Sequence, residues 1–221
     1  LAALGLHWDG EVVRQSERFE RYDAAIAALD RQGLTYPCFC TRREIREAVS
    51  APHAGDVVQG AYPGTCRALT SAERAARATD GRPPAVRLRS QVAVLTVDDD
   101  LLGPITAAVD DVVLRRNDGV PAYNLAVVVD DAAQAVDQVV RGDDLASSSP
   151  RQRHLADLLG LPAVRYAHVP LVLAPSGARL AKRDGAATLE DQARLGRTAA
   201  EVLALLGAAS GLCEPGDVVT A

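Results

Sequence analysis

Three of the four cysteines fall in one stretch that is rich in proline and glycine. Cys38 and Cys40 form a Cys-x-Cys pair, and Cys66 ends the segment Tyr-Pro-Gly-Thr-Cys. Structural zinc sites use four tetrahedral ligands, mostly thiolates and imidazoles. The spacing therefore predicts a metal site with three thiolates, whose fourth ligand is either His53 or Tyr62. Buried free thiols or a disulfide are the alternatives, although a disulfide is disfavoured in a chain of cytosolic character.

A second group of polar residues borders two predicted strands. Tyr123 precedes the apolar run 125–129, and Arg141 ends the run 138–141. Ligands of parallel α/β sheets bind at the carboxyl ends of strands, where the guanidinium of Arg141 offers a fork for a carboxylate. Nearby aspartates offer partners for an amino group. The alternative is that these acids cap helices and that Arg141 forms a structural ion pair.

Lys182 is the only lysine of the sequence and lies between Arg179 and Arg183, after the turn Pro-Ser-Gly. A compact ammonium is not replaced by an arginine fork where a point charge is needed. Phosphoryl and adenylyl transfer need cations that meet the charge on phosphate oxygens. The segment is a candidate for that role, and a solvated basic turn is the alternative.

The elements that must position these residues follow from periodicity and turn signals. We predict helices at 16–32, with Ser16 as N-cap, at 42–49, after a Thr70/Glu73 capping box, at 150–159 and at 188–206. Extended segments are predicted at 86–89, 92–95, 112–115, 125–129, 138–141 and 169–173, with a turn at Asp118-Gly119. The apolar run 125–129 is typical of a strand buried on both faces.

The amino-acid composition limits the classes of protein to which this chain can belong. The 221 residues are 48% hydrophobic with a formal net charge of −5, which excludes disorder and a wholly basic nucleic-acid binder. No apolar run approaches the roughly 20 residues of a membrane helix, so we expect a cytoplasmic protein without membrane contact. Alternating helices and strands with an antiparallel region between them predict an α/β fold that carries an insertion.

Taken together, the motifs resemble the class I aminoacyl-tRNA synthetases of the glutamyl branch, in family order over nearly the whole chain. The segments that carry the resemblance are 4–10, Cys38-x-Cys40 with Tyr62-x3-Cys66, 114–119, 123–131, 140–145, 149–152 and 179–183. The resemblance implies a Rossmann-type parallel sheet built from residues 1–35 and 120–185. It also implies an inserted zinc-containing α+β subdomain at 36–119 and a C-terminal helical stem-contact segment at 186–221.

Within that branch, the short chain and the tyrosine of the cysteine set are similar to the glutamyl-queuosine tRNA(Asp) synthetases. This resemblance implies a ligase that activates L-glutamate with ATP and Mg²⁺, without tRNA, and transfers it to the queuosine base in the anticodon of tRNA(Asp). A monomer is expected. The implied site residues are Tyr123 and Arg141 for glutamate, Lys182 for ATP as the catalytic cation, and Cys38, Cys40, Tyr62 and Cys66 for one structural zinc.

The sequence departs from the family pattern in two ways. The lysine loop has Arg179 and Ala181 where the family has lysine and serine, which removes one phosphate hydrogen bond of roughly 0.5–1.5 kcal/mol. The family's His-x-Gly-His-like adenosine motif and its early glutamate-binding acid do not occur in these residues. Residues 1–221 alone are therefore expected to form adenylate poorly or not at all.

Two other functions stay open. A truncated glutamyl-tRNA synthetase would use the same chemistry to charge the tRNA 3′ end. A non-catalytic zinc-containing remnant would bind RNA, with Arg42, Arg43, Arg46, Arg115 and Arg116 as candidate phosphate contacts.

Overall fold

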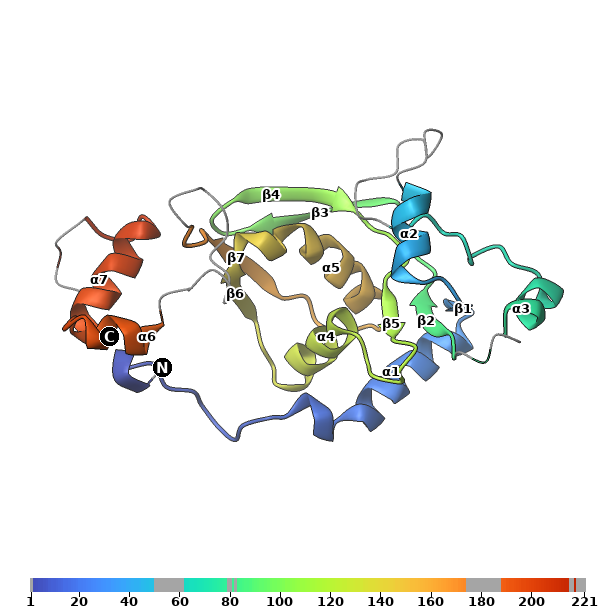
Figure 1. The fold of residues 1–221 in the computed structure, drawn as a ribbon, viewed down its shortest axis with the longest axis horizontal. Coiled ribbons are helices and arrows are strands. Elements are labelled where there is room, and N and C mark those ends of the chain that lie inside the picture. Colours follow the sequence, from blue (N-terminus) through green and yellow to red (C-terminus); the bar gives the residue numbers. More distant parts are fainter. Residues whose placement is uncertain are drawn as a thin grey trace. The chain divides into compact units, whose positions relative to one another are not determined.

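The computed structural model describes residues 2–49, 62–78, 81, 83–173, 188–214 and 217, and it divides into two compact units (Figure 1). The larger unit comprises Val13–Val140 and Leu145–Ala167. The smaller unit comprises Leu1–Val12, Arg141–Asp144 and His168–Ala221. No helix in the described part of the chain has the length and apolarity that crossing a membrane requires.

Helices and strands alternate through the larger unit. Its elements are η2 (Gln15–Glu17), α1 (Phe19–Arg31), β1 (Thr35–Cys38), α2 (Arg42–Val49), α3 (Ser71–Ala78), β2 (Ala85–Leu88), β3 (Val94–Asp99), β4 (Gly103–Ala108), β5 (Val113–Arg115), α4 (Tyr123–Ala133) and α5 (Ser149–Leu158). Both units share β6 (Gln138–Gly142), η3 (Asp143–Ser148) and β7 (Arg165–Val169). The smaller unit adds η1 (Ala2–Leu4), α6 (Leu189–Arg194) and α7 (Ala199–Ala209).

The strands form two sheets. β1, β2 and β5 make a three-stranded sheet in which both pairings are antiparallel. The other sheet has the order β4-β3-β7-β6, with β3 antiparallel to β4 and parallel to β7. The predicted α/β class is therefore confirmed in the form of mixed α/β sheets.

The core of the larger unit lies where three helices meet the first sheet. α4 packs between α1 and α5 (Figure 1). Their buried side chains join those of β2 and β5 in one apolar cluster, formed by Tyr22, Ile26, Leu29, Leu88, Val112, Leu114, Leu125, Ala126, Val128, Leu155 and Ala156. A second, smaller cluster holds Tyr36, Cys38, Tyr62 and Cys66. The candidate metal ligands are therefore part of a packed region.

One sequence prediction was wrong in element type. The run 125–129, predicted as a buried strand, is the middle of helix α4. Leu125, Ala126, Val128 and Asp130 are buried, and at 100° per residue they lie on more than one face of the helix, as expected for a helix packed between two others. β-branched residues lower helix propensity only slightly, and packing against α1 and α5 overrides this preference. Tyr123 consequently begins a helix and does not open a strand.

Other predictions differed at the element ends. Ser16 lies in η2, and Arg18 is the N-cap residue of α1. The strand predicted at 92–95 runs instead from Val94 to Asp99, and the strand predicted at 169–173 is β7, which ends at Val169. The predicted helix 188–206 is two helices, separated at Gly196, whose φ of 80° is accessible mainly to glycine.

Several local signals were correct. Helix α2 occupies the predicted residues, and α5 has proline in its first turn. Thr70 and Glu73 exchange the hydrogen bonds of a capping box before α3. The Asp118-Gly119 turn brings the Arg116 N–H to within 2.9 Å of the Val120 carbonyl oxygen, with Gly119 at a φ of 83°.

Candidate metal site and substrate-binding residues

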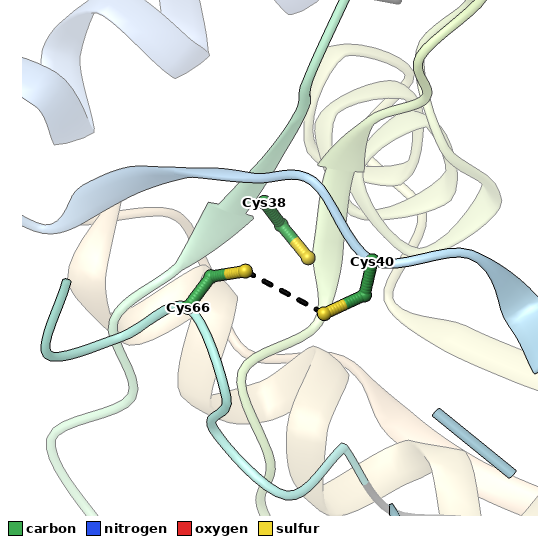
Figure 2. A group of neighbouring side chains, drawn as sticks. All are labelled: Cys38, Cys40 and Cys66. Atoms are coloured by element: carbon green, nitrogen blue, oxygen red, sulfur yellow. Dashed lines mark hydrogen bonds between the residues drawn. The ribbon is translucent and has the colours of Figure 1, made fainter. Parts of the chain in front are cut away.

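The sulfur atoms of Cys38, Cys40 and Cys66 lie within 4.8 Å of one another, pointing toward a common centre (Figure 2). The Sγ atoms of Cys40 and Cys66 are 3.5 Å apart, and all four cysteines of the chain are free thiols. The phenol oxygen of Tyr62 completes the group, 3.4 Å from the Sγ of Cys38 and 3.8 Å from the Sγ of Cys40. The predicted cysteine cluster therefore exists in the fold.

These distances fit a tetrahedral ion. Zinc–sulfur bonds of about 2.3 Å and zinc–oxygen bonds of about 2.0 Å give tetrahedral edges of roughly 3.8 Å between sulfurs and roughly 3.5 Å between sulfur and oxygen. The Cys40–Cys66, Cys38–Tyr62 and Cys40–Tyr62 separations lie within a few tenths of an ångström of those edges. The donor set is thus suited to a thiophilic divalent cation. His53 lies outside the described residues.

Two separate segments supply the ligands. Cys38 ends β1, whose pairing with β2 fixes it opposite Ala85, and Cys40 follows two residues later. Tyr62 and Cys66 belong to a turn that Gly64 permits with a φ of 79°. Within this turn, the backbone N–H of Cys66 donates to the Tyr62 oxygen at 2.8 Å. A metal bound here would tie the turn to the edge of the first sheet.

The electrostatic surroundings of the four ligands differ. Burial, followed by the neighbouring Cys38, raises the pKa of the Cys40 thiol to about 12. Burial and the hydrogen bond with Cys38 also raise the pKa of Tyr62. Burial opposes ionisation of Cys66 as well, but hydrogen bonds from the Phe39 backbone and the neighbouring side chains outweigh it, and the pKa of Cys66 is lowered. A bound cation would favour the anionic form of all four groups.

The predicted substrate residues lie in different parts of the structure. Tyr123, at the first residue of α4, is 51% exposed and belongs to the larger unit. Arg141, in β6, belongs to the smaller unit, where its Nε donates a 3.0 Å hydrogen bond to the Nε2 of His168. Lys182, like Arg179, Ala181 and Arg183, lies outside the described residues.

The candidate phosphate contacts on the surface are partly engaged with acidic neighbours. Arg115 pairs with Asp23, and Arg116 pairs with Asp118. Arg43 lies 3.7 Å from Glu47, one helical turn away on α2. These pairs are exposed or half-buried, so each contributes little to stability.

Sequence reasoning did not identify the residues that support the candidate ligands. His168 is fully buried beneath Arg141, and the guanidinium of Arg87 stacks on the ring of Tyr62. Asp110 accepts a 2.9 Å hydrogen bond from the backbone N–H of Tyr62 and pairs with Arg151 at 3.3 Å. Each of these contacts joins residues more than twenty positions apart, so no local motif marks it.

Comparison with known proteins identifies the family of this chain. Residues 1–209 match the catalytic domain of the class I tRNA synthetases for glutamate and glutamine (E and Q). The chain belongs to this family. The resemblance that the motifs indicated is therefore confirmed, and the family consists of ligases that join amino acids to tRNA.

Named relatives in this synthetase family are close in sequence. The chain is 62% identical over 212 residues to the glutamyl-Q tRNA(Asp) synthetase of Nocardia farcinica, which covers 96% of this chain and 67% of that protein. It is 53% identical over 217 residues to the protein of the same name from Cutibacterium acnes, covering 98% and 60%. The chain thus spans between 60% and 67% of the length of these two relatives.

Two solved structures of glutamate-tRNA ligases have a fold similar to that of this chain. A glutamate tRNA ligase from Elizabethkingia meningosepticum, crystallised in complex with its amino acid, superposes with a TM-score of 0.66 at 28% identity. The superposition covers 83% of this chain and 40% of that structure. The glutamate-tRNA synthetase of Elizabethkingia anophelis gives a TM-score of 0.62 at 30% identity, over 78% of this chain and 37% of that one.

Proposed function

We propose that the protein activates L-glutamate with ATP, without needing tRNA for this step, and transfers it to the queuosine base in the anticodon of tRNA(Asp). The observation that carries this proposal is the 62% identity, over nearly the whole chain, to a relative named glutamyl-Q tRNA(Asp) synthetase. The cluster of Cys38, Cys40, Tyr62 and Cys66 supports it, because a tyrosine beside three cysteines, in place of a fourth thiolate or an imidazole, is the ligand set that the resemblance to these synthetases implies.

Glutamate recognition is assigned to Arg141 and Tyr123. Arg141 is half-buried, and its Nε donates a hydrogen bond to His168, which orients the guanidinium that would bind a carboxylate of the substrate. The Tyr123 hydroxyl, on an exposed side chain at the start of α4, supplies a neutral hydrogen-bonding group. Arg141 would bind a charged group of the substrate, and Tyr123 would bind a neutral one.

The chemical step needs little covalent help from the protein. The α-carboxylate oxygen of glutamate attacks the α-phosphorus of ATP, which enters as its Mg²⁺ complex. The bond from that phosphorus to the bridging oxygen breaks, and pyrophosphate leaves. Catalysis is then mostly positioning and charge stabilisation, with Lys182 as the cation that meets the phosphate oxygens.

Zinc is the proposed occupant of the thiol cluster, with Cys38, Cys40, Cys66 and Tyr62 as its ligands. Its contribution is structural, because four protein ligands leave no open position for substrate. We assign residues 1–35 and 120–185 to the Rossmann-type core, 36–119 to the zinc-containing insertion, and 186–221 to contacts with the anticodon stem-loop of tRNA(Asp). The protein would act as a monomer.

A second candidate function is favoured by the fold comparison. Both reported structural neighbours are glutamate-tRNA ligases, so charging of the tRNA 3′ end uses the same fold and the same adenylate. A non-catalytic zinc-containing RNA-binding remnant is a third reading, which would bind metal and tRNA without forming adenylate.

Adenylate formation is tested by glutamate-dependent exchange of labelled pyrophosphate into ATP, in the protein that carries this chain. The proposal expects exchange in the absence of tRNA, dependence on L-glutamate, and loss of exchange in a Lys182→Ala variant. Exchange that appears only after tRNA is added would contradict tRNA-independent activation. The complete absence of exchange with either tRNA(Asp) or tRNA(Glu) would favour the non-catalytic remnant.

A further inference from the structure

The guanidinium of Arg87 lies flat against the candidate metal ligand Tyr62. The Cζ of Arg87 is 3.6 Å from the centroid of the Tyr62 ring, well inside the roughly 6 Å reach of a cation–π contact. Arg87 is only 7% exposed, and Tyr62 is equally buried. The contact is therefore desolvated, which is the situation in which such interactions are strongest.

Burial of Arg87 requires compensation, because a desolvated cation is costly unless it is paired or hydrogen-bonded. Its Nη1 donates a 2.7 Å hydrogen bond to the backbone oxygen of Asp111. Its Nε, by contrast, is buried and makes no hydrogen bond within the described part of the chain. A large share of the favourable contact of this guanidinium is therefore made by the face of Tyr62.

The position of the guanidinium is itself fixed. Arg87 lies in β2, directly opposite Tyr36 of β1, and the register with β5 shifts between Val86 and Arg87. Such irregularities redirect side chains. The carboxylate of Asp111, whose carbonyl binds Arg87, accepts hydrogen bonds from the Tyr36 hydroxyl at 2.5 Å and the Ser90 N–H at 2.8 Å. Arg87 thus belongs to a rigid part of the sheet.

Tyr62 is consequently held at three places. Its backbone N–H is bound by Asp110, its oxygen accepts the N–H of Cys66, and its ring face is covered by Arg87. The first two contacts fix the ends of the residue, while rotation of the side chain out of the thiol cluster would require the ring to leave Arg87. The oxygen that faces Cys38 at 3.4 Å is kept there by this stack.

We propose that Arg87 is a positioning residue of the metal site, which stacks on Tyr62 and holds its oxygen at the fourth corner of the tetrahedron. Arg87 thereby determines that a protein oxygen, and not water, completes the coordination. The inference rests on the proposed occupancy of the thiol cluster by zinc. It assigns to a residue of β2 a role that neither its sequence position nor the cysteine motif indicates.

Cobalt(II) is the probe, because its visible absorption reports coordination geometry and ligand type in a zinc site. Metal-free protein is titrated with Co²⁺, and zinc affinity is measured by competition. We expect Arg87→Met to weaken affinity by about tenfold, in the range seen for residues that support metal ligands, and to shift the Co²⁺ spectrum toward that of Tyr62→Phe. The double variant Arg87→Met/Tyr62→Phe should bind no more weakly than Tyr62→Phe, because Arg87 acts through Tyr62.

Arg89→Met is the matched control. Arg89 is an arginine just beyond the same strand, and its Cζ stands 5.0 Å from the ring of Tyr36, which is not a candidate ligand. Its affinity for Co²⁺ should stay within about twofold of the parent, since it touches no ligand. Circular dichroism and thermal unfolding establish that each variant is folded. Should Arg87→Met fail to fold, Arg87→Lys decides, since it keeps the charge and loses the planar stack.

The outcomes separate the two claims. Absence of Co²⁺ and zinc binding by the parent protein removes the proposed metal site itself. Binding by the parent with an unchanged affinity and spectrum in Arg87→Met, or in a folded Arg87→Lys where Met does not fold, leaves the metal site standing and overturns the role of Arg87. An equal loss in Arg89→Met would also overturn it, because the effect would then be a general one of removing a charge from the sheet.

Discussion

The Nε of Arg141 donates a hydrogen bond to the Nε2 of His168 over 3.0 Å, and His168 is fully buried. The imidazole nitrogen accepts this bond, and His168 thereby fixes one edge of the guanidinium. A bidentate carboxylate contact depends on the orientation of the guanidinium plane, so His168 helps to orient Arg141, the residue proposed to bind glutamate.

Replacing Arg141 by lysine should impair glutamate binding selectively. Lysine keeps the charge but loses both the planar fork and the contact with His168. We expect the KM for glutamate in pyrophosphate exchange to rise by about tenfold or more, equivalent to the 1.5–3 kcal/mol of a charged hydrogen bond, with a much smaller change for ATP. Arg165→Lys, at an exposed residue of β7, is the control. Equal changes in both KM values would argue against a glutamate contact.

Removal of one thiol should remove the metal. Purified protein is expected to contain about one zinc per chain, and Cys38→Ser should lose it and unfold at a lower temperature, because metal binding contributes to folding. Cys213→Ser is the matched control, since the Cys213 sulfur lies 3.7 Å from the Ala204 carbonyl oxygen and is not part of the cluster. Atomic absorption measures the zinc content of the parent and of both variants. Zinc retained by Cys38→Ser would exclude this residue as a ligand.

The buried carboxylate of Asp130 links α4 to α1. Tyr22 donates to its Oδ2 at 2.6 Å, and Arg18 lies 3.1 Å from its Oδ1. Tyr22→Phe should lower the free energy of unfolding by roughly 1–3 kcal/mol, because it removes a buried hydrogen bond to a charged group. Urea denaturation measures the change, and Tyr123→Phe, at an exposed ring, should alter stability by less than about 0.5 kcal/mol. Similar values for both variants would refute the role of the Tyr22 contact.

Alkaline pH tests the same contact. Burial, followed by the hydrogen bond with Asp130, raises the pKa of Tyr22 to about 12 from its usual 10.0. The unfolded chain then loses the Tyr22 proton before the folded one does. This contribution to stability is complete below pH 10 and should disappear as the pH rises toward 12. We expect the free energy of unfolding, measured by urea denaturation at each pH, to fall less over that range in Tyr22→Phe than in the parent. Identical pH profiles for the two proteins would contradict this expectation.

His154 should make stability depend on pH in the opposite direction. Burial lowers its pKa below the usual 6.5, although Asp157 partly opposes the shift. Its Nε2 accepts the Gln91 N–H at 3.2 Å, which requires the neutral ring. The unfolded state then binds a proton at higher pH than the folded state. The stabilisation is present above pH 6.5 and is lost as the pH falls through the lowered value.

A His154→Gln variant keeps a hydrogen-bond acceptor but cannot titrate. We expect its free energy of unfolding to fall less steeply than that of the parent as the pH is lowered from 6.5. His7→Gln, at an exposed residue, should follow the parent profile. Parallel profiles for the parent and His154→Gln would show that His154 does not contribute.

The comparison between sequence and structure shows which features are local. The Thr70/Glu73 capping box and the Asp118-Gly119 turn depend on residues a few positions apart, and both were predictable. Helix α4 was not, because a run of valines is compatible with a buried strand and with a buried helix. What decides between them is packing against α1 and α5, which the run itself does not encode.

In the candidate site, too, some residues were predictable from the sequence and others were not. The residue type and spacing of Cys38 and Cys40 predict a metal site, and the fold brings Cys66 and Tyr62 close to them. Arg87 gives no such signal, since an arginine in a strand is ordinary and its partner Tyr62 lies in a turn that is distant in the sequence. Supporting residues of this kind are found only once the fold has placed them.

The most direct test of the central claim is the place at which labelled glutamate is attached to tRNA. The protein that carries this chain is incubated with ATP, labelled glutamate and queuosine-containing tRNA(Asp), and the tRNA is then cleaved with a nuclease. The account predicts label in the anticodon fragment, with none transferred to tRNA(Asp) that lacks queuosine. In a parallel incubation with tRNA(Glu), label at the 3′-terminal adenosine together with no label on tRNA(Asp) would contradict it and identify an ordinary glutamyl-tRNA synthetase.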